Sequence, residues 1–264
     1  MRSPQDSRAA GLGGAEPGVL PAGRICLFLD FDGTLVEFAD DPRDVRPDAH
    51  LPQLLSSLQL ALDGAVALIS GRRLEELDVL LHPLRLPAAG LHGLERRDAQ
   101  GRLRLRPPTA AGPELRGLRS RLRELVAAHA GLLLEDKGAA LALHYRRAPE
   151  LQETVQRAVA ALVAPLAPQL QLLRGDMVLE IKPQAPDKAT AVEGFMREPP
   201  FAGRVPVFVG DDVTDRDGFG AVRRHHGMTV AVGARVTAQW RLPDPAAVRT
   251  WLARIAEAGG RRES

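Results

Sequence analysis

The sequence is poor in cysteine, in lysine and in long apolar runs, and the first and last of these shortages each exclude a class of protein. The single cysteine, Cys26, rules out an internal disulfide, and its place in an apolar run predicts a buried side chain. No apolar run approaches the ~20 residues that a membrane span needs. The formal net charge is only +2, and the basic residues are scattered among acidic ones, which argues against a nucleic-acid partner.

The remaining composition is that of a folded protein. The chain has 264 residues, of which 45% are hydrophobic and 26% are charged, and this length suits a core domain that carries a smaller insert. The first residues are rich in glycine, alanine and proline and lack the apolar segment of a signal peptide, so we expect a flexible tail at residues 1–23. We expect a monomeric cytoplasmic protein that contacts no membrane.

The scarcity of lysine is itself informative. Only Lys137, Lys182 and Lys188 are lysines among the 35 basic residues, and the others are arginines. A compact ammonium group on a flexible stem differs chemically from a planar guanidinium. The three lysines therefore indicate positions where arginine would not serve, although chance alone could also produce such a distribution.

The two outer parts of the chain alternate strands and helices. Apolar runs at residues 25–30, 66–69 and 205–209 are typical of buried parallel strands, and residues 51–62, 74–81 and 189–196 show helical spacing. This alternation predicts a doubly wound, mostly parallel, Rossmann-like α/β core at residues 24–96 and 183–258. Its site is expected at the carboxyl ends of the strands.

The middle of the chain has a different pattern. Residues 102–106 alternate leucine and arginine after Gly101, which predicts a hairpin, and residues 114–129 have helical spacing. Paired strands are then predicted at 132–135 and 139–146, a helix from Pro149, and a second strand pair at 170–173 and 177–181. The order αββαββ predicts an antiparallel α+β cap domain inserted at residues 97–182.

Two carboxylates follow the first predicted strand, in the segment Asp30-Phe31-Asp32-Gly33-Thr34. The glycine lets the backbone turn, and acids two residues apart at a strand end aim both carboxylates at one point. The pair suits phosphoryl transfer, with Asp30 as nucleophile and Asp32 as general acid and then general base. The alternative is an ordinary turn, because Asp-Gly is a common turn dipeptide.

Two further segments suit phosphate binding. Ser70-Gly71-Arg72 directly follows the strand predicted at residues 66–69, which places a hydroxyl at another strand end, although Ser-Gly is also a usual strand-to-helix turn. Lys188 begins a predicted helix, and a helix N-terminus already favours anions. A solvated surface lysine is the alternative there, but the rarity of lysine in this chain favours a function.

An acidic cluster follows the strand predicted at residues 205–209. It contains Asp211, Asp212 and Asp215 within a few residues. Magnesium is commonly held by one or two carboxylates together with substrate phosphate and water. Because these acids would repel one another without a cation, the cluster predicts a Mg²⁺ site rather than an acidic surface loop.

These four segments, in this order and on these elements, resemble the four motifs of haloacid dehalogenase superfamily phosphatases. Within that superfamily, several stretches look like the pattern of trehalose-6-phosphate phosphatases: residues 90–95 (GLHGLE), 135–138 (EDKG), 144–146 (HYR), 180–183 (EIKP) and 210–215 (GDDVTD). The resemblance covers nearly all of the chain after the tail. It implies a Mg²⁺-dependent phosphatase that hydrolyses trehalose 6-phosphate through an aspartyl-phosphate, the last step of trehalose biosynthesis, with the insert as a C2B-type lid.

The resemblance also implies roles for individual residues. Asp30, the backbone carbonyl of Asp32, and Asp211 would bind Mg²⁺, with Asp212 and Asp215 supporting the site. The phosphate would be held by Lys188 together with Thr34, Ser70, Gly71 and Arg72. The sugar hydroxyls would meet His92, Glu135, Lys137, Arg146, Glu180 and Lys182, which gives each of the three lysines a role.

Two other functions share much of this pattern. One is a related phosphatase acting on another phosphosugar, such as sucrose 6-phosphate or a mannosyl phosphoglycerate, and the lid residues would discriminate it. The other is a non-catalytic sugar-phosphate sensor, which we would expect to have lost an acid, whereas Asp30, Asp32 and Asp211 are present. The chain departs from the family pattern at Ala189, where glycine is usual, and at Arg216, where glutamate is usual.

Overall fold

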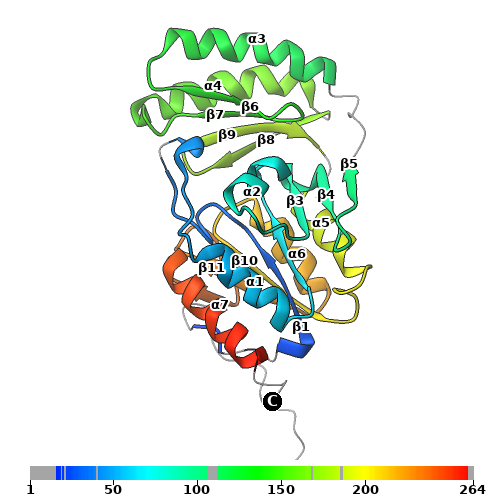
Figure 1. Cartoon of the computed structure of the whole chain (residues 1–264). Coiled ribbons are helices and arrows are strands. Elements are labelled where there is room, and N and C mark those ends of the chain that lie inside the picture. Colours follow the sequence, from blue (N-terminus) through cyan, green and yellow to red (C-terminus); the bar gives the residue numbers. More distant parts are fainter. Residues whose placement is uncertain are drawn as a thin grey trace, which may run out of the picture.

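The computed structural model describes residues 16–18, 20, 22–39, 41–105, 112–167, 169–184 and 187–260. Most of the tail expected at residues 1–23 lies outside these ranges. The described residues form one large and one small sheet, each covered by its own helices, and the small unit sits over one end of the large one (Figure 1). This arrangement confirms the predicted α/β core with an inserted α+β unit.

The large sheet has eight strands in the order β12-β11-β10-β1-β2-β3-β4-β5. Neighbours from β12 to β3 are parallel, while β4 pairs antiparallel with both β3 and β5. The strands are β1 (Ile25–Leu29), β2 (Val66–Ile69), β3 (Ala88–Gly90), β4 (Glu95–Arg97), β5 (Leu103–Leu105), β10 (Val205–Gly210), β11 (Met228–Val232) and β12 (Trp240–Leu242).

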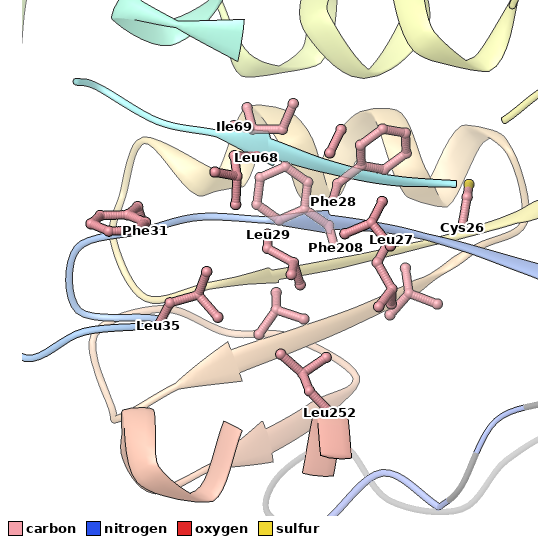
Figure 2. Close-up of a cluster of buried hydrophobic side chains, with 14 of the residues drawn as sticks. Cys26, Leu27, Phe28, Leu29, Phe31, Leu35, Leu68, Ile69, Phe208 and Leu252 are labelled. Carbon is pink, nitrogen blue, oxygen red and sulfur yellow. The ribbon is translucent and has the colours of Figure 1, made fainter. Parts of the chain in front are cut away.

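Strand β1 lies in the middle of the sheet and is buried on both faces, because helices cover the sheet on each side. Figure 2 shows Leu27 and Leu29 pointing toward Leu252, while Phe28 points to the opposite side. On that side the Phe28 ring lies 5.9 Å, centroid to centroid, from the ring of Phe195. Side chains of a strand alternate between faces, so a continuous apolar run is the sequence signature of such a doubly covered strand.

The helices of the core cover both faces of the large sheet. Helix α1 packs on α7 and α5 packs on α6, and Figure 1 shows the two pairs on opposite sides of the large sheet. The core helices are α1 (Leu51–Ala61), α2 (Leu74–Leu80), α5 (Lys188–Met196), α6 (Asp215–Arg224) and α7 (Pro245–Gly260). No helix within the described ranges is both long and apolar enough to cross a membrane.

The small unit, which we call the lid, follows the predicted order αββαββ. Its antiparallel sheet has the order β6-β7-β9-β8, and its helices lie on the face that points away from the core (Figure 1). Its own cluster of buried apolar side chains is separate from the core cluster. The elements are α3 (Gly112–Ala128), β6 (Leu133–Asp136), β7 (Leu141–His144), α4 (Gln152–Val163), β8 (Leu170–Gly175) and β9 (Val178–Pro183).

The hairpin predicted near Gly101 extends the large sheet. Strand β5 pairs with β4, which pairs with β3, so residues 97–105 continue the core sheet although the sequence analysis placed them in the insert. The alternation of leucine and arginine predicts a strand at a sheet edge, but it does not say which of the two sheets the strand joins. We therefore propose that the lid begins after residue 105 and ends at the last residues of β9.

Candidate active site

Three neighbouring parallel strands end at one edge of the large sheet, and each is followed by a polar residue. Asp30 follows β1, Ser70 follows β2 and Asp211 follows β10, and the three strands are adjacent in the order β10-β1-β2. All three side chains are buried. The structure thus brings together groups that are distant in sequence, at the edge where open α/β sheets bind their ligands.

Lys188 joins two of the buried acids. It is the first residue of α5, whose N-cap Asp187 accepts a hydrogen bond of 2.7 Å from the backbone N–H of Thr190. Its Nζ donates to Asp30 Oδ1 at 2.7 Å and to Asp215 Oδ1 at 2.5 Å. A cation shared between two carboxylates offsets part of the cost of burying them.

The pKa values of Lys188 and Asp30 are both raised, but for different reasons. Burial alone would lower the pKa of Lys188, but the carboxylates of Asp215 and Asp30 outweigh it and raise that pKa above its ordinary value. Burial raises the pKa of Asp30, which Lys188 partly counteracts and the neighbouring acids reinforce. A carboxylate is therefore kept ionised here only with cationic help.

Asp215 holds the loop that follows β10. Its Oδ2 accepts hydrogen bonds of 2.9 Å from the backbone N–H groups of Asp211 and Asp212, and its Oδ1 is taken by Lys188. Both oxygens of Asp215 are thus engaged within the protein. The loop is fixed so that Asp211 projects toward Asp30.

The buried acids form a cluster suited to a divalent cation. Carboxylate oxygens of Asp30, Asp211 and Asp215 lie within 4.8 Å of one another. Asp211 Oδ2 is buried and accepts no hydrogen bond from the described residues, although Arg235 Nη2 lies 3.1 Å away. Burial, followed by the charge of Asp215, raises the pKa of Asp211 to about 7. Clustered oxygen ligands with an unsatisfied oxygen fit a hard divalent cation.

Asp32 is held differently from Asp30. Arg72 donates from Nε to Asp32 Oδ2 and from Nη2 to Asp32 Oδ1, both at 2.7 Å, and Nη2 also donates to the carbonyl of Pro42 at 3.1 Å. Such a two-point pair fixes the carboxylate in one orientation. The guanidinium that the sequence analysis assigned to phosphate is thus engaged with the second acid of the motif.

The remaining predicted phosphate residues have distinct positions. Ser70 and Gly71 line the cavity between core and lid, and the Ser70 hydroxyl accepts a hydrogen bond of 3.1 Å from the backbone N–H of Arg72. Thr34 is buried, and its hydroxyl donates to Asp211 Oδ1 at 3.2 Å. Gly33 adopts a φ of +79°, and a Cβ there would lie 2.5 Å from Asp211 Oδ2, so the turn requires glycine.

The lid closes over these groups. Lys137 Nζ of the lid donates to the carbonyl of Gly71 in the core at 2.9 Å, and Glu180 of β9 contacts His92 Nε2 in the core. One cavity is lined by both units. The predicted residues that line it are Asp30, Asp32, Ser70, Gly71, Arg72, His92, Glu135, Lys137, Arg146, Glu180, Lys188, Asp211 and Asp212.

The roof of the cavity carries charged groups that already have partners. Glu135 Oε2 contacts His144 Nε2 at 2.9 Å, and Lys137 Nζ lies 3.4 Å from Glu180 Oε1. Burial alone would raise the pKa of Glu135, but His144 and Lys137 hold it below its ordinary value. This face of the lid offers both hydrogen-bond acceptors and donors to a polar ligand.

A second contact region joins lid and core beside the loop that follows β10. Arg146 donates to Asp176 Oδ2 at 2.5 Å, and Arg235 Nη1 lies 3.3 Å from the same oxygen. The guanidinium carbons of Arg146 and Arg235 lie 5.4 and 4.6 Å from the centroid of the Phe38 ring. Asp176 and Arg146 belong to the lid, whereas Phe38 and Arg235 belong to the core.

Two residues singled out in the sequence are not among the described residues that line the cavity. Lys182 is buried, at 2% exposed. Burial lowers its pKa. Arg216, the departure noted beside the acidic cluster, is solvent-exposed.

Sequence reasoning assigned no role to Phe38, His144, Asp176 or Arg235. His144 begins the recognised stretch at residues 144–146, and strand alternation places it on the same face as Arg146, which was an available signal. Asp176, Phe38 and Arg235 lie on loops, and no periodicity or spacing pointed to them.

Comparisons with known proteins identify relatives of this chain. The family model described as trehalose-phosphatase matches residues 28–246. The trehalose-6-phosphate phosphatase of Escherichia coli (strain K12) is 43% identical over 88% of this chain and 86% of the relative. A probable trehalose-phosphate phosphatase of Sinorhizobium fredii is 41% identical over 87% of each chain. The solved C-terminal domain of a C. albicans trehalose-6-phosphate phosphatase shares the fold, with a TM-score of 0.82, 21% identity, and coverage of 94% of this chain and 99% of that one.

Proposed function

Because the chain belongs to the trehalose-phosphatase family, we propose that it is a phosphatase that hydrolyses trehalose 6-phosphate to trehalose and inorganic phosphate. One observation carries the reaction type. The carboxylate of Asp30 faces the cavity at a strand end, and Lys188 Nζ binds one of its oxygens at 2.7 Å. A buried carboxylate oriented by a lysine is suited to act as a nucleophile toward a phosphate.

In the proposed reaction a free oxygen of Asp30 attacks phosphorus. The new P–O bond forms as the bond between phosphorus and the sugar oxygen breaks, and Asp32 delivers the proton that the sugar alkoxide needs. Asp32 then takes a proton from water, which hydrolyses the aspartyl-phosphate and releases phosphate. Lys188, Ser70 and the Gly71 backbone are placed along the same cavity wall and would bind the phosphate oxygens.

The acidic cluster would hold Mg²⁺. Asp30, Asp211 and the backbone carbonyl of Asp32 would be the ligands, with Asp212 and Asp215 in support. Engagement of both Asp215 oxygens by Lys188 and the loop backbone favours a supporting role for that residue. When bound, the cation would neutralise charge on the phosphate and on the carboxylates around it.

The lid would recognise the sugar. Glu135, Lys137, Glu180 and Arg146 line the cavity opposite the core residues, and together they offer acceptors and donors for hydroxyl groups. A site that hydrogen-bonds a substrate discriminates strongly, since each group left unpaired costs ~1–3 kcal/mol. The monomeric state and the cytoplasmic location expected from the sequence stay predictions.

The direct test is phosphate release with Mg²⁺ from trehalose 6-phosphate, sucrose 6-phosphate and glucose 6-phosphate. We expect the highest kcat/KM for trehalose 6-phosphate, and no turnover by Asp30→Asn at an unchanged melting temperature, because an amide matches the acid in shape but is a poor nucleophile. A preference for sucrose 6-phosphate would reject the substrate assignment. Activity of a folded Asp30→Asn variant near that of wild type would reject the covalent mechanism.

A further inference from the structure

His92 occupies a backbone position that side chains rarely adopt. Leu91, His92 and Gly93 have φ values of 49°, 54° and 104°, all in the left-handed region. The backbone N–H of His92 donates to the carbonyl of Ser70 at 2.9 Å, and a Cβ at residue 93 would lie 2.7 Å from the carbonyl oxygen of Asp187. Non-glycine residues persist in this region only where their surroundings determine it, and such positions cluster at functional sites.

The turn aims the imidazole at the lid. His92 is buried at 5% exposed, and its Nε2 contacts Glu180 Oε2 of β9. A Cβ at residue 71 would lie 2.8 Å from His92 Nε2, so glycine at that position leaves room for the ring. Two segments of the core, the turns after β2 and β3, are therefore shaped around one side chain that reaches across to the lid.

The contact is a hydrogen bond donated by the ring. Burial lowers the pKa of His92, an effect that the Glu180 carboxylate partly counteracts. An ionised carboxylate only accepts hydrogen bonds, so the ring nitrogen that meets it, Nε2, carries a proton. The other nitrogen, Nδ1, is buried and has no hydrogen-bond partner among the described residues.

Glu180 is consequently held from both units. Its Oε2 meets His92 of the core, and its Oε1 lies 3.4 Å from Lys137 Nζ, which itself donates to the Gly71 carbonyl of the core at 2.9 Å. The carboxylate, only 7% exposed, can take this position only when the lid is closed on the core.

We propose that His92 is a positioning residue for sugar recognition, which holds the lid carboxylate Glu180 in its binding orientation and thereby makes lid closure a condition of sugar binding. The proposal rests on the function proposed above for the lid. It differs from the role expected from the sequence, in which His92 contacts the sugar itself. In that role, the working atom would be Nδ1, whereas the present proposal requires only the donor at Nε2.

Two amide substitutions separate these roles. In His92→Gln, the side-chain amide can place an N–H near the position of Nε2, and in His92→Asn the amide replaces Nδ1 and leaves Glu180 without a donor. His92→Phe keeps the ring shape and removes both nitrogens. We expect His92→Phe and His92→Asn to lower kcat/KM for trehalose 6-phosphate by ~10- to 100-fold, and at least ~10 times more than for an aryl phosphate. His92→Gln should recover most of this loss.

Two further measurements keep the test decisive. In a Glu180→Gln background, adding His92→Phe should lower kcat/KM for trehalose 6-phosphate by less than a further ~3-fold. The reason is that the effects of two residues that act as a unit are not additive. Amide hydrogen exchange of residues 178–183 should be faster in His92→Phe than in wild type and close to wild type in His92→Gln. This readout needs no substrate, so its failure is distinguishable from failure of the proposed function.

Three results would overturn the proposal. They are full retention of sugar activity by His92→Asn with loss by His92→Gln, additive losses in the double variant, and unchanged amide exchange in a folded His92→Phe variant. The first would show that the histidine contacts the sugar through Nδ1. Wild type could fail to act on trehalose 6-phosphate while the amide exchange of residues 178–183 still changed as expected. The contact between His92 and Glu180 would then hold the lid on the core, and the role in sugar recognition would be rejected.

Discussion

Arg72 binds Asp32 through two parallel hydrogen bonds, each 2.7 Å long. The guanidinium is almost buried, and its third contact, to the carbonyl of Pro42, fixes it to the loop that follows the nucleophile motif. The second acid of the motif is thus oriented by a residue from the neighbouring strand end. Arg72 has few hydrogen-bond donors left for a phosphate.

This relationship predicts how Arg72 variants differ between substrates. Lysine cannot form the two-point pair, so Arg72→Lys should leave Asp32 poorly oriented. Because a sugar alkoxide needs a proton and a nitrophenolate does not, we expect kcat/KM to fall ~10-fold or more on trehalose 6-phosphate and several times less on p-nitrophenyl phosphate. Asp32→Asn is the matched control and should show the same selectivity. Equal losses on both substrates, with weaker inhibition by inorganic phosphate, would instead make Arg72 a phosphate ligand.

The contacts of Lys188 predict that its replacement lowers both the activity and the stability of the protein. Its Nζ lies between Asp30 and Asp215, so Lys188→Met leaves two buried carboxylates without their cation, and breaking a buried pair costs ~3–5 kcal/mol. Urea unfolding should show this loss at pH 8 and a smaller one at pH 5, because burial raises the pKa of Asp30 and lets it take up a proton. Activity should fall on sugar and aryl phosphates alike. The double variant Lys188→Met with Asp30→Asn should recover part of the stability, and the absence of any recovery would contradict the pairing.

The raised pKa of Asp211 predicts that the stability of the metal-free protein depends on pH. Its folded pKa, raised from 3.8 to about 7, lies above the unfolded value, so its stabilising contribution is complete below pH 3.8 and is lost as the pH rises through 7. The shift corresponds to an upper limit of ~4 kcal/mol. In chelator, Asp211→Asn should therefore be more stable than wild type at pH 8, and the two should converge toward pH 5. Mg²⁺ should stabilise wild type at pH 8 and the variant much less; identical melting curves at both pH values would contradict the assignment.

Glu180 and Lys182 predict different defects although they lie two residues apart on β9. Glu180 lines the cavity, whereas Lys182 is buried and is not among the described residues that line it. We expect Glu180→Gln to lower kcat/KM for trehalose 6-phosphate ~10- to 100-fold with a smaller effect on an aryl phosphate. Lys182→Met should change the melting temperature more than the ratio of the two activities. A selective loss of activity on trehalose 6-phosphate in a fully stable Lys182→Met variant would show that Lys182 contacts the sugar, as expected from the sequence.

Part of this protein could be predicted from local sequence because the determining physics is local. Apolar runs that end in Asp30, Ser70 and Asp211 predict buried parallel strands, and parallel neighbours end at one sheet edge. The alternation of helix and strand signals predicted the lid in its correct order αββαββ. The core sheet, the two acids after β1 and the acidic loop after β10 therefore followed from residue order alone.

Other features depend on contacts that no local pattern encodes. The assignment of β4 and β5 to the core sheet is a pairing between strands, and the same hairpin sequence would have suited the lid. The contacts of Arg72 with Asp32 and of Thr34 with Asp211 are matters of side-chain direction, which depends on the packing of neighbouring elements.

The sequence by itself determined which chemical groups stand at the strand ends, because strand periodicity and the glycine turns are properties of a few consecutive residues. Only the tertiary structure decided which of those groups pair with one another. The pairs Arg72–Asp32 and His92–Glu180 join residues 40 and 88 positions apart. The first pair depends on the pairing of β1 with β2 and the second on the packing of the lid on the core. Hydrogen bonds act only over a few ångströms, so the fold must form before such partners can meet.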